Sequence, residues 1–389
     1  MERAALSACL VLAVLCGGRA CGQTAGVASS SVVWEGVRID RDIAYGPRGD
    51  APGEGNGRAH RSGQFFDFLV NAGTPPRADA PVYVNLHGGA WCQPFDKDGE
   101  SLAFFKLLVA RGFVVVNANY QLQNDVTASG TMPPRRPHAT FHDMLRDLDD
   151  LGTFLVRNFL PRQGVRARSC ALGGWSAGAH LALLYAYDQD HPGVLGAPRS
   201  QQVATLPEQQ PVFLPEQQTT TLSGRFPLRH DLRVGFAVDV VGPVDLADDD
   251  FVAPLLGRRA PFGTWWDAAA IDRLVTLLGW LMNDDLRGRR ARGDEDGMRA
   301  VLARFSPTRL VTPRTVPTIL AYCRRFPFAG TDGCVPTSAY DGLRERLETA
   351  GVPVAGDIRT FRSHGRLGEG YTVWLADQIA AFARRGYLK

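Results

Sequence analysis

Two short motifs contain the residue types that acyl transfer requires. The first is Gly174-Trp175-Ser176-Ala177-Gly178, a G-x-S-x-G sequence between an apolar run and a helix-forming segment. In a strand–turn–helix context the serine stands on a strained turn, and the flanking glycines avoid clashes that side chains would cause. Its hydroxyl then lies at a helix N-terminus, where developing negative charge is stabilised. Ser176 is therefore the predicted nucleophile.

The second motif is His87-Gly88-Gly89-Ala90-Trp91, which directly follows the apolar run 81–86. Small residues here allow backbone N–H groups to approach an oxyanion, and the N–H after the nucleophile supplies another donor. By itself the motif is also consistent with a tight glycine turn after a strand. Its occurrence upstream of a G-x-S-x-G motif favours the catalytic interpretation.

These motifs need a rigid frame, and the surrounding sequence alternates between strand and helix patterns. The alternation predicts a mostly parallel sheet with helices on both faces, which is an α/β fold. The expected strands cover residues 32–37, 42–45, 65–70, 81–86, 113–118, 168–173, 234–241, 317–322 and 356–361. The expected helices cover residues 101–111, 141–159, 177–187, 338–350 and 371–385.

With both motifs in this order, the chain resembles the α/β-hydrolases of the esterase and lipase superfamily. The H-G-G-x-W form resembles the feruloyl/acetyl esterase-like and kynurenine formamidase-like branch, and Ser306-Pro307 and the segment 241–246 are further family-like landmarks. The resemblance implies an α/β-hydrolase fold with a helical cap insertion. It also implies an oxyanion hole from the N–H groups of Gly89, Ala90 and Ala177, with Gly88 as a further candidate. A related lipase pattern has a third glycine where Ala90 stands.

The catalytic base should follow Ser176 in the chain. Four of the eight histidines do so, namely His180, His191, His230 and His364. His180 is one turn into the expected helix after Ser176, too close to come from a separate loop, and His191 and His230 bracket a low-complexity segment. His364 follows the last expected strand, where the fold places its base, and is the predicted base.

The catalytic acid is expected on the loop after the penultimate strand. Asp332 lies there and fits the family's Asp-x-x-Val-Pro pattern, although the segment 324–329 before it is longer than usual. Asp239 and Asp245, near the strand 234–241, remain alternatives. An isolated aspartate in a turn is often only a turn former.

Two insertions interrupt the alternation. Residues 188–232 contain the near-duplicates Leu206-Pro-Glu-Gln-Gln210 and Leu214-Pro-Glu-Gln-Gln218, which indicate a low-complexity surface loop. Residues 245–300 form a cap-like insertion in which apolar residues follow helical spacing from Ile271 to Met282. That helix could be a lid over the substrate or simply part of the packing. The arginines within 287–292 are expected to form a solvated loop, or alternatively to contact an acidic substrate or lipid headgroups.

The N-terminal residues indicate export. Residues 1–20 have an uncharged apolar run at 4–15 and small residues before Cys21, as in a signal peptide. Cys21 stands where a bacterial lipoprotein is lipidated, although Gly18 occupies a position that is usually aliphatic. The mature chain is thus expected to be periplasmic, cell-surface or secreted, with any membrane attachment through Cys21. Residues 21–62 are expected to be a tether with edge strands, and residues 63–389 the hydrolase domain.

The composition is typical of a globular protein. The 389 residues carry 43 basic and 40 acidic side chains, so a net charge of +3 gives no electrostatic basis for binding nucleic acid. The sequence has no H-E-x-x-H, P-loop or dinucleotide fingerprint, so neither a metal nor another cofactor is implied. Cys323 and Cys334 could form a disulfide or remain free thiols.

The resulting hypothesis is a serine hydrolase that cleaves carboxylic esters, with Ser176, Asp332 and His364 as a triad and a small-molecule ester as its partner. Short-chain acyl, acetyl or feruloyl-type esters are the expected substrates. An amidase, a peptidase or a lipase on the same fold is an alternative, and so is a non-catalytic binding lipoprotein. The oligomeric state is not indicated.

Overall fold

The computed structural model describes residues 28–49, 63–92, 101–123, 139–189, 231–258, 268–323, 337–359 and 368–388. Within them one nine-stranded sheet forms the centre of the molecule, in the order β1-β2-β3-β5-β4-β6-β7-β8-β9. Its strands are β1 (Ser30–Trp34), β2 (Val37–Gly49), β3 (Gly63–Asn71), β4 (Val82–Leu86), β5 (Val114–Ala118), β6 (Ser169–Trp175), β7 (Arg233–Val240), β8 (Thr318–Cys323) and β9 (Val354–Arg359).

The sheet has an antiparallel and a parallel part. Strands β1, β2 and β3 pair antiparallel and join β5, whereas every pair from β5 through β4 to β9 is parallel. The buried patterns of β4 and β5 match the expectation for parallel strands covered on both faces. The carboxyl ends of β4, β6, β7, β8 and β9 therefore meet at one edge of the sheet, which is where ligands bind in open α/β sheets.

Helices cover both faces of the sheet. They are α1 (Leu102–Ala110), α2 (Phe141–Phe154), α3 (Ala177–Asp188), α4 (Asp249–Leu255), α5 (Ala268–Met282), α6 (Leu286–Arg292), α7 (Glu295–Arg304), α8 (Pro307–Leu310), α9 (Thr337–Thr349) and α10 (Glu369–Phe382). One apolar cluster packs α1 and α10 against the sheet, and a second packs α2, α3 and α9 against its other face. The α/β-hydrolase architecture expected from the sequence is thus confirmed.

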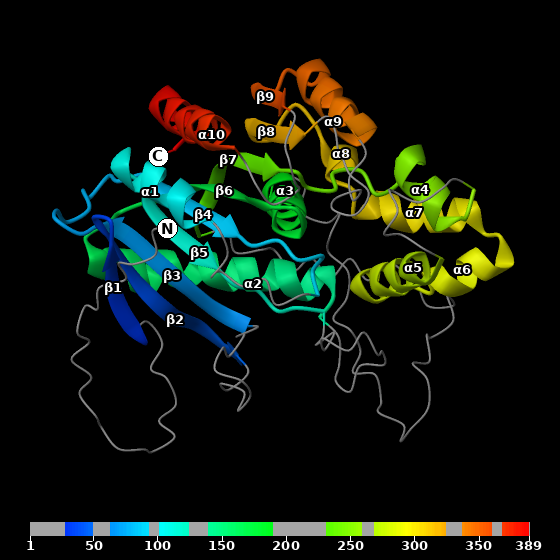
Figure 1. The fold of residues 1–389 in the computed structure, drawn as a ribbon, viewed down its shortest axis with the longest axis horizontal. Helices are drawn as coiled ribbons and strands as arrows, with labels where there is room; N and C mark the ends of the chain where they lie inside the picture. Colours follow the sequence, from blue (N-terminus) through cyan, green and yellow to red (C-terminus); the bar gives the residue numbers. More distant parts are fainter. Residues whose placement is uncertain are drawn as a thin grey trace, which may run out of the picture.

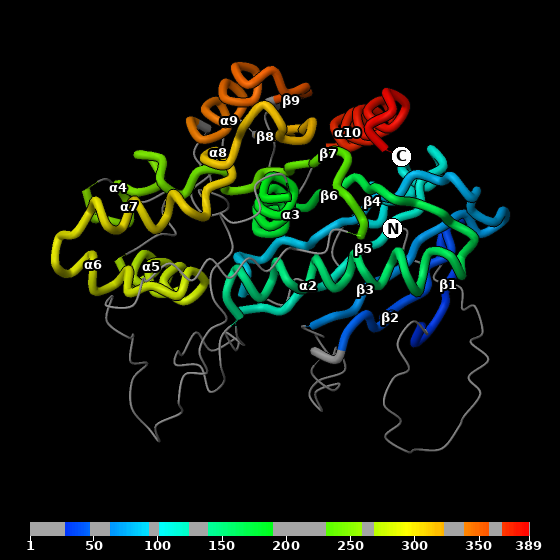
Figure 2. Tube along the Cα trace, turned by 180° about the vertical axis from the view of Figure 1, so that it is seen from behind, coloured from blue at the N-terminus to red at the C-terminus, as the bar shows by residue number. Residues whose placement is uncertain are grey.

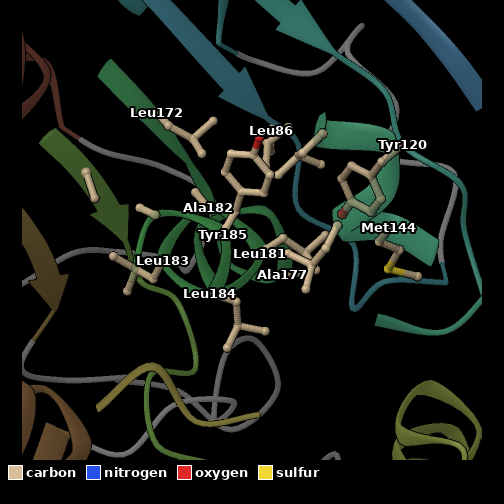
Figure 3. Packing of buried hydrophobic residues seen from close by; sticks show 14 of the residues in the cluster. Leu86, Tyr120, Met144, Leu172, Ala177, Leu181, Ala182, Leu183, Leu184 and Tyr185 are labelled. Atoms are coloured by element: carbon tan, nitrogen blue, oxygen red, sulfur yellow. The ribbon is translucent and has the colours of Figure 1, made fainter. Parts of the chain in front are cut away.

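The second cluster surrounds α3, which is buried on every side. Leu181 and Tyr185 of α3 pack near Leu86 of β4 and Leu172 of β6, and Met144 of α2 lies near Tyr120 in the same cluster (Figure 3). A helix with this environment must be apolar all round. Such a helix holds its N-terminus rigidly.

The insertion between β7 and β8 contains helices α4 to α7. They group at the end of the molecule opposite β1 and β2 (Figures 1 and 2). The apolar residues noted between Ile271 and Met282 lie on α5, where Ile271, Val275 and Leu278 are buried against the main core. Among the described helices, none is long and apolar enough to cross a bilayer.

Several element boundaries differ from expectation; for example, the strand expected at 42–45 is part of the longer β2. The stretch 32–37 is not one strand, because Glu35 and Gly36 adopt φ values of +47° and +85° and form the turn between β1 and β2. The helix expected over 141–159 ends as α2 at Phe154 and continues as a π-helical turn over Leu155–Phe159. The strand expected at 356–361 is β9, which begins two residues earlier.

The N-terminal strands are part of the same sheet as the hydrolase core. The boundary expected between residues 62 and 63 falls between β2 and β3, and these two strands pair along most of their length. Residues 1–27 and nearly all of 188–232 lie outside the described residues. The expectations for the signal peptide, the tether, Cys21 and the low-complexity insertion therefore remain predictions.

Candidate active site

Ser176 stands in a strained turn between β6 and α3. Its backbone has φ +52° and ψ −117°, a conformation that L residues rarely adopt. The turn is held because the Ser176 N–H donates to the Val240 carbonyl of β7 at 2.8 Å, and its carbonyl accepts from His180 N at 3.0 Å. The residue is half-buried, and its side chain makes no capping hydrogen bond to α3. A strained backbone at a half-buried serine is typical of a functional position.

Gly174 and Gly178 permit this turn because no side chain fits beside it. A Cβ on Gly174 would lie 2.6 Å from the Leu86 carbonyl oxygen, and a Cβ on Gly178 would lie 2.3 Å from the same oxygen. Real Cβ atoms do not approach backbone oxygens so closely. The two glycines thus let the turn after β6 pack directly against the end of β4.

The motif after β4 lies beside Ser176. A Cβ on Gly88 would lie 3.1 Å from the Trp175 carbonyl oxygen and 3.4 Å from Ser176 Cβ. Gly89, Ala90 and Trp91 follow with φ values of +113°, +49° and +59°. The structure therefore brings the two sequence motifs together, as their proposed roles require.

Aromatic contacts hold this loop, which comprises residues 87–92, in place. The His87 ring stacks on Tyr120 with centroids 4.5 Å apart, and Tyr120 Oη donates to the His87 carbonyl at 2.9 Å. A ring nitrogen of His87 lies 2.6 Å from the Gly88 carbonyl oxygen. Trp91 is buried against Phe141 of α2. Sequence reasoning did not identify Tyr120, because only the pairing of β4 with β5 places it under the loop.

The backbone N–H groups of the oxyanion-hole candidates are placed where they could bind a substrate oxygen. Gly88 and Gly89 are half-buried and Ala90 is exposed, so a substrate can reach their backbone. In the described part of the chain no hydrogen bond uses the N–H of Gly89 or Ala90. Ala177 is the first residue of α3, and the first N–H groups of a helix have no partner within it.

The predicted acid and base both lie outside the described residues. Asp332 follows β8 and His364 follows β9, and the structure describes these two strands up to Cys323 and Arg359. Both strands run parallel to β6 on the same side of the sheet order, so the chain leaves them at the edge where Ser176 stands. Cys334 and the side chain of Cys323 are also outside the description, so their pairing remains a prediction.

The structure describes both alternative acids, Asp239 and Asp245, and each carboxyl group already has hydrogen-bond or ion-pair partners. Asp239 on β7 is fully buried; burial raises its pKa to about 8, while the Gly242 N–H at 2.8 Å acts in the opposite direction. A carboxyl group that is neutral at pH 7 cannot stabilise an imidazolium. Asp245 pairs with Arg309 Nε at 3.2 Å and accepts from the Ala247 N–H at 3.0 Å.

Of the other histidines after Ser176, only His180 is described. Its ring is fully buried, with Nε2 2.8 Å from the Phe305 carbonyl oxygen, and burial lowers its pKa to about 4. The ring faces the cap rather than solvent, so it has no access to an incoming substrate. His191 and His230 lie outside the described residues.

A strained residue that sequence reasoning missed is Val241. It follows β7 with φ +51°, which is unusual for a β-branched residue, and it is fully buried. Its N–H donates to the Ala321 carbonyl of β8 at 3.0 Å. Val241 directly follows Val240, whose carbonyl accepts from the Ser176 N–H, so this end of β7 supports the turn at Ser176. The sequence marked the segment 241–246 only as a family-like landmark and gave no sign of this backbone strain.

The arginine cluster within 287–292 is helical rather than a loop. Arg289 bridges Asp284 and Asp294 at 2.8 and 2.7 Å, and Arg290 pairs with Asp272 of α5 at 2.5 Å. These arginines therefore join cap helices to one another. Among the described residues no group of three or more His, Cys, Asp or Glu side chains could hold a metal ion.

The family model BD-FAE, from an α/β-hydrolase-type esterase family, matches residues 71–261, which include both motifs. No curated protein sequence matches the chain significantly.

Solved esterase structures share the fold. A truncated carbohydrate esterase from gut microbiota superposes with a TM-score of 0.56 at 15% identity, covering 93% of this chain and 99% of that one. Esterase B from Lactobacillus rhamnosis gives 0.53 at 14% identity, with 92% and 89% covered. A bifunctional GH43-CE protein of Bacteroides eggerthii gives 0.56 at 17% identity over 89% of this chain, which spans 38% of that protein's length.

Proposed function

We propose that this chain, an α/β-hydrolase and a carboxylic-ester hydrolase by its family match, cleaves its substrates through a covalent acyl-enzyme on Ser176. The supporting observation is the strained Ser176 at the N-terminus of α3, directly beside Gly88. Strain of this kind exposes a serine hydroxyl to an acyl carbon while backbone donors face the carbonyl oxygen.

The proposed reaction has two halves. His364 takes the hydroxyl proton as Ser176 Oγ bonds to the acyl carbon, and Asp332 orients and stabilises the resulting imidazolium. The imidazolium then protonates the alcohol as its bond to the acyl carbon breaks. Water then attacks the acyl carbon while His364 takes its proton. The imidazolium returns that proton to Ser176 Oγ as the acyl–serine bond breaks and the acid leaves.

The proposed oxyanion hole consists of backbone N–H groups from the two motifs. Gly89 and Ala90 approach from the loop after β4, with Gly88 as a further donor, and Ala177 contributes the first N–H of α3. Loss of one such donor costs on the order of 10²–10³ in kcat in enzymes of this type. The proximity of Gly88 to Ser176 supports this proposal, because Gly89 and Ala90 directly follow Gly88 in the same loop.

Labelling by a fluorophosphonate tests the nucleophile. The wild-type protein should be labelled at one site, and Ser176→Ala should abolish labelling without changing the fold. Ser338→Ala is a matched control, because its hydroxyl bonds to Asp248 and Asp250 on the cap side and should keep full labelling. Persistent labelling of folded Ser176→Ala protein would refute the assignment.

Substitution of the acid tests the triad. Asp332→Asn should lower kcat by on the order of 10³–10⁴, by analogy with serine protease triads. Near-normal turnover in Asp332→Asn, together with a large loss in Asp245→Asn, would show that the acid comes from the loop after β7.

We further propose that short or small acyl groups are preferred, as in the esterases that the H-G-G-x-W motif resembles. A lipase must shelter a long apolar tract, since each buried CH₂ contributes about 0.8 kcal/mol. The buried residues of α5 are used in packing against the core. Rates measured as kcat/KM on acetate, butyrate, octanoate and palmitate esters of one alcohol should peak at acetate or butyrate. Rising values to palmitate would indicate a lipase, and faster cleavage of matched amides would indicate an amidase or peptidase.

Export is proposed from the N-terminal sequence alone. Expression of the full chain in a bacterium should yield a product cleaved before or near Cys21. Incorporation of labelled palmitate that is lost in Cys21→Ser would demonstrate lipidation, whereas cleavage without incorporation would indicate a soluble exported enzyme. Retention of the uncleaved chain inside the cell would refute export.

A further inference from the structure

His180 lies at the junction of three pieces of the proposed site. It belongs to the first turn of α3, where its N–H donates to the Ser176 carbonyl at 3.0 Å. Its ring lies against Trp91 of the loop after β4, with centroids 5.1 Å apart and planes at 75°. Its Nε2 lies 2.8 Å from the carbonyl oxygen of Phe305, which follows the last residue of α7.

The surrounding aromatic side chains make this junction compact. Phe141 at the start of α2 contacts the His180 ring at 5.0 Å and the Phe305 ring at 5.3 Å between centroids, and Trp91 contacts Phe141 at 5.4 Å. All four rings are buried. A displacement of any one of them must therefore move the others, since protein interiors are close-packed.

The hydrogen bond from His180 has a defined direction. A carbonyl oxygen only accepts, so Nε2 carries the proton and donates to Phe305. The ring is neutral at pH 7, because burial lowers the pKa of His180 to about 4. A neutral donor to the end of α7 leaves no uncompensated charge in the core.

We propose that His180 is a positioning residue that fixes the loop of residues 87–92 and the end of cap helix α7 relative to Ser176. The inference rests on the proposed function, because it assigns a role within that serine site. The packing of the His180 ring against Trp91 positions the loop that carries Gly89 and Ala90. The hydrogen bond from the ring to the Phe305 carbonyl positions the end of α7. A displacement of about 1 Å at a catalytic group costs on the order of 10² in rate, so a loosened ring should lower kcat.

The test separates positioning from general stability. His180→Phe keeps an aromatic ring but removes the donor, and His180→Gln keeps a donor at a similar reach. Tyr187→Phe is the matched control, because Tyr187 is fully buried on the same helix and its hydroxyl bonds Thr318 Oγ1 at 2.9 Å, far along α3 from Ser176. Each variant is measured for Tm, for kcat and KM on a short-chain ester, and for its rate of fluorophosphonate labelling.

We expect His180→Phe to lower kcat and the labelling rate by about 10- to 100-fold, with KM changed by less than about threefold. His180→Gln should recover most of this loss, and Tyr187→Phe should lower Tm with kcat unchanged. If His180→Phe does not fold, His180→Met, a flexible side chain without a donor, takes its place.

Two results would overturn the inference. The first is a folded donor-free variant whose kcat lies within twofold of the kcat of Tyr187→Phe. The second is a loss of kcat in His180→Gln as large as the loss in the donor-free variant. A wild-type protein that neither hydrolyses esters nor reacts with the fluorophosphonate would instead overturn the proposed function.

Discussion

Replacing Asp239 by asparagine should stabilise the protein in a strongly pH-dependent way. Asp239 lies within β7, opposite Gly174 of β6 and Leu320 of β8, and is fully buried. Its Oδ1 accepts from the Gly242 N–H at 2.8 Å, and this interaction favours the charged form. Burial outweighs it and raises the pKa from the usual 3.8 to about 8. The carboxyl group is thus protonated at neutral pH in the folded protein.

The sign of the effect follows from linkage. In the unfolded chain the carboxyl group ionises near its usual pKa, whereas the folded protein retains the proton until about pH 8. The unfolded state is therefore favoured progressively as pH rises from about 4 to 8, by about 1.4 kcal/mol for each pH unit. At pH 7 the accumulated loss is on the order of 4 kcal/mol, and it levels off above pH 8.

Asparagine removes this penalty because its amide does not ionise in either state. Its side-chain oxygen can still accept from the Gly242 N–H. Urea unfolding of wild-type and Asp239→Asn protein at pH 5, 6, 7 and 8 should show a stability difference that favours the variant increasingly with pH. A difference independent of pH would refute the argument that Asp239 is protonated. A loss of kcat by about 10³ in Asp239→Asn would show instead that Asp239 is the triad acid.

Three further substitutions test the backbone of the site and its ion pairs. Ala90→Gly should raise the free energy of unfolding by about 0.5–1 kcal/mol. The strain energy that glycine relieves at the left-handed φ of Ala90 exceeds the free-energy cost of the extra conformational entropy that glycine gives the unfolded chain. A lower Tm would contradict this prediction. Gly178→Ala should destabilise by at least about 2 kcal/mol and abolish labelling, since its Cβ would lie 2.3 Å from the Leu86 carbonyl oxygen; an active, stable variant would show that the turn can shift. Asp245→Asn should lower stability by about 1 kcal/mol through its contact with Arg309 while keeping kcat within about threefold, so a large loss of kcat would assign it a catalytic role.

Local patterns in the sequence were sufficient to predict the fold and the strained turn at Ser176. Alternation of apolar runs with helical periodicity predicted the parallel sheet, because strands buried on both faces must be apolar throughout, as in β4 and β5. Gly174 and Gly178 marked the turn at Ser176, because only glycine fits there. Boundaries were less accurate, since the turn at Glu35 and Gly36 has little local signal beyond a single glycine.

Tertiary structure decided how the remaining groups are used. The sequence left Asp239 and Asp245 open as alternatives to Asp332, and the fold distinguishes these two by burying Asp239 and pairing Asp245 with Arg309. His180 was recognised only as too close to Ser176, whereas packing places its ring between Trp91 and Phe305. Turns, strands and helices depend on short-range sterics and periodicity, which the sequence contains. The pKa of a carboxyl group and the partner of a ring depend on residues brought together from distant parts of the chain, so only the folded structure determines them.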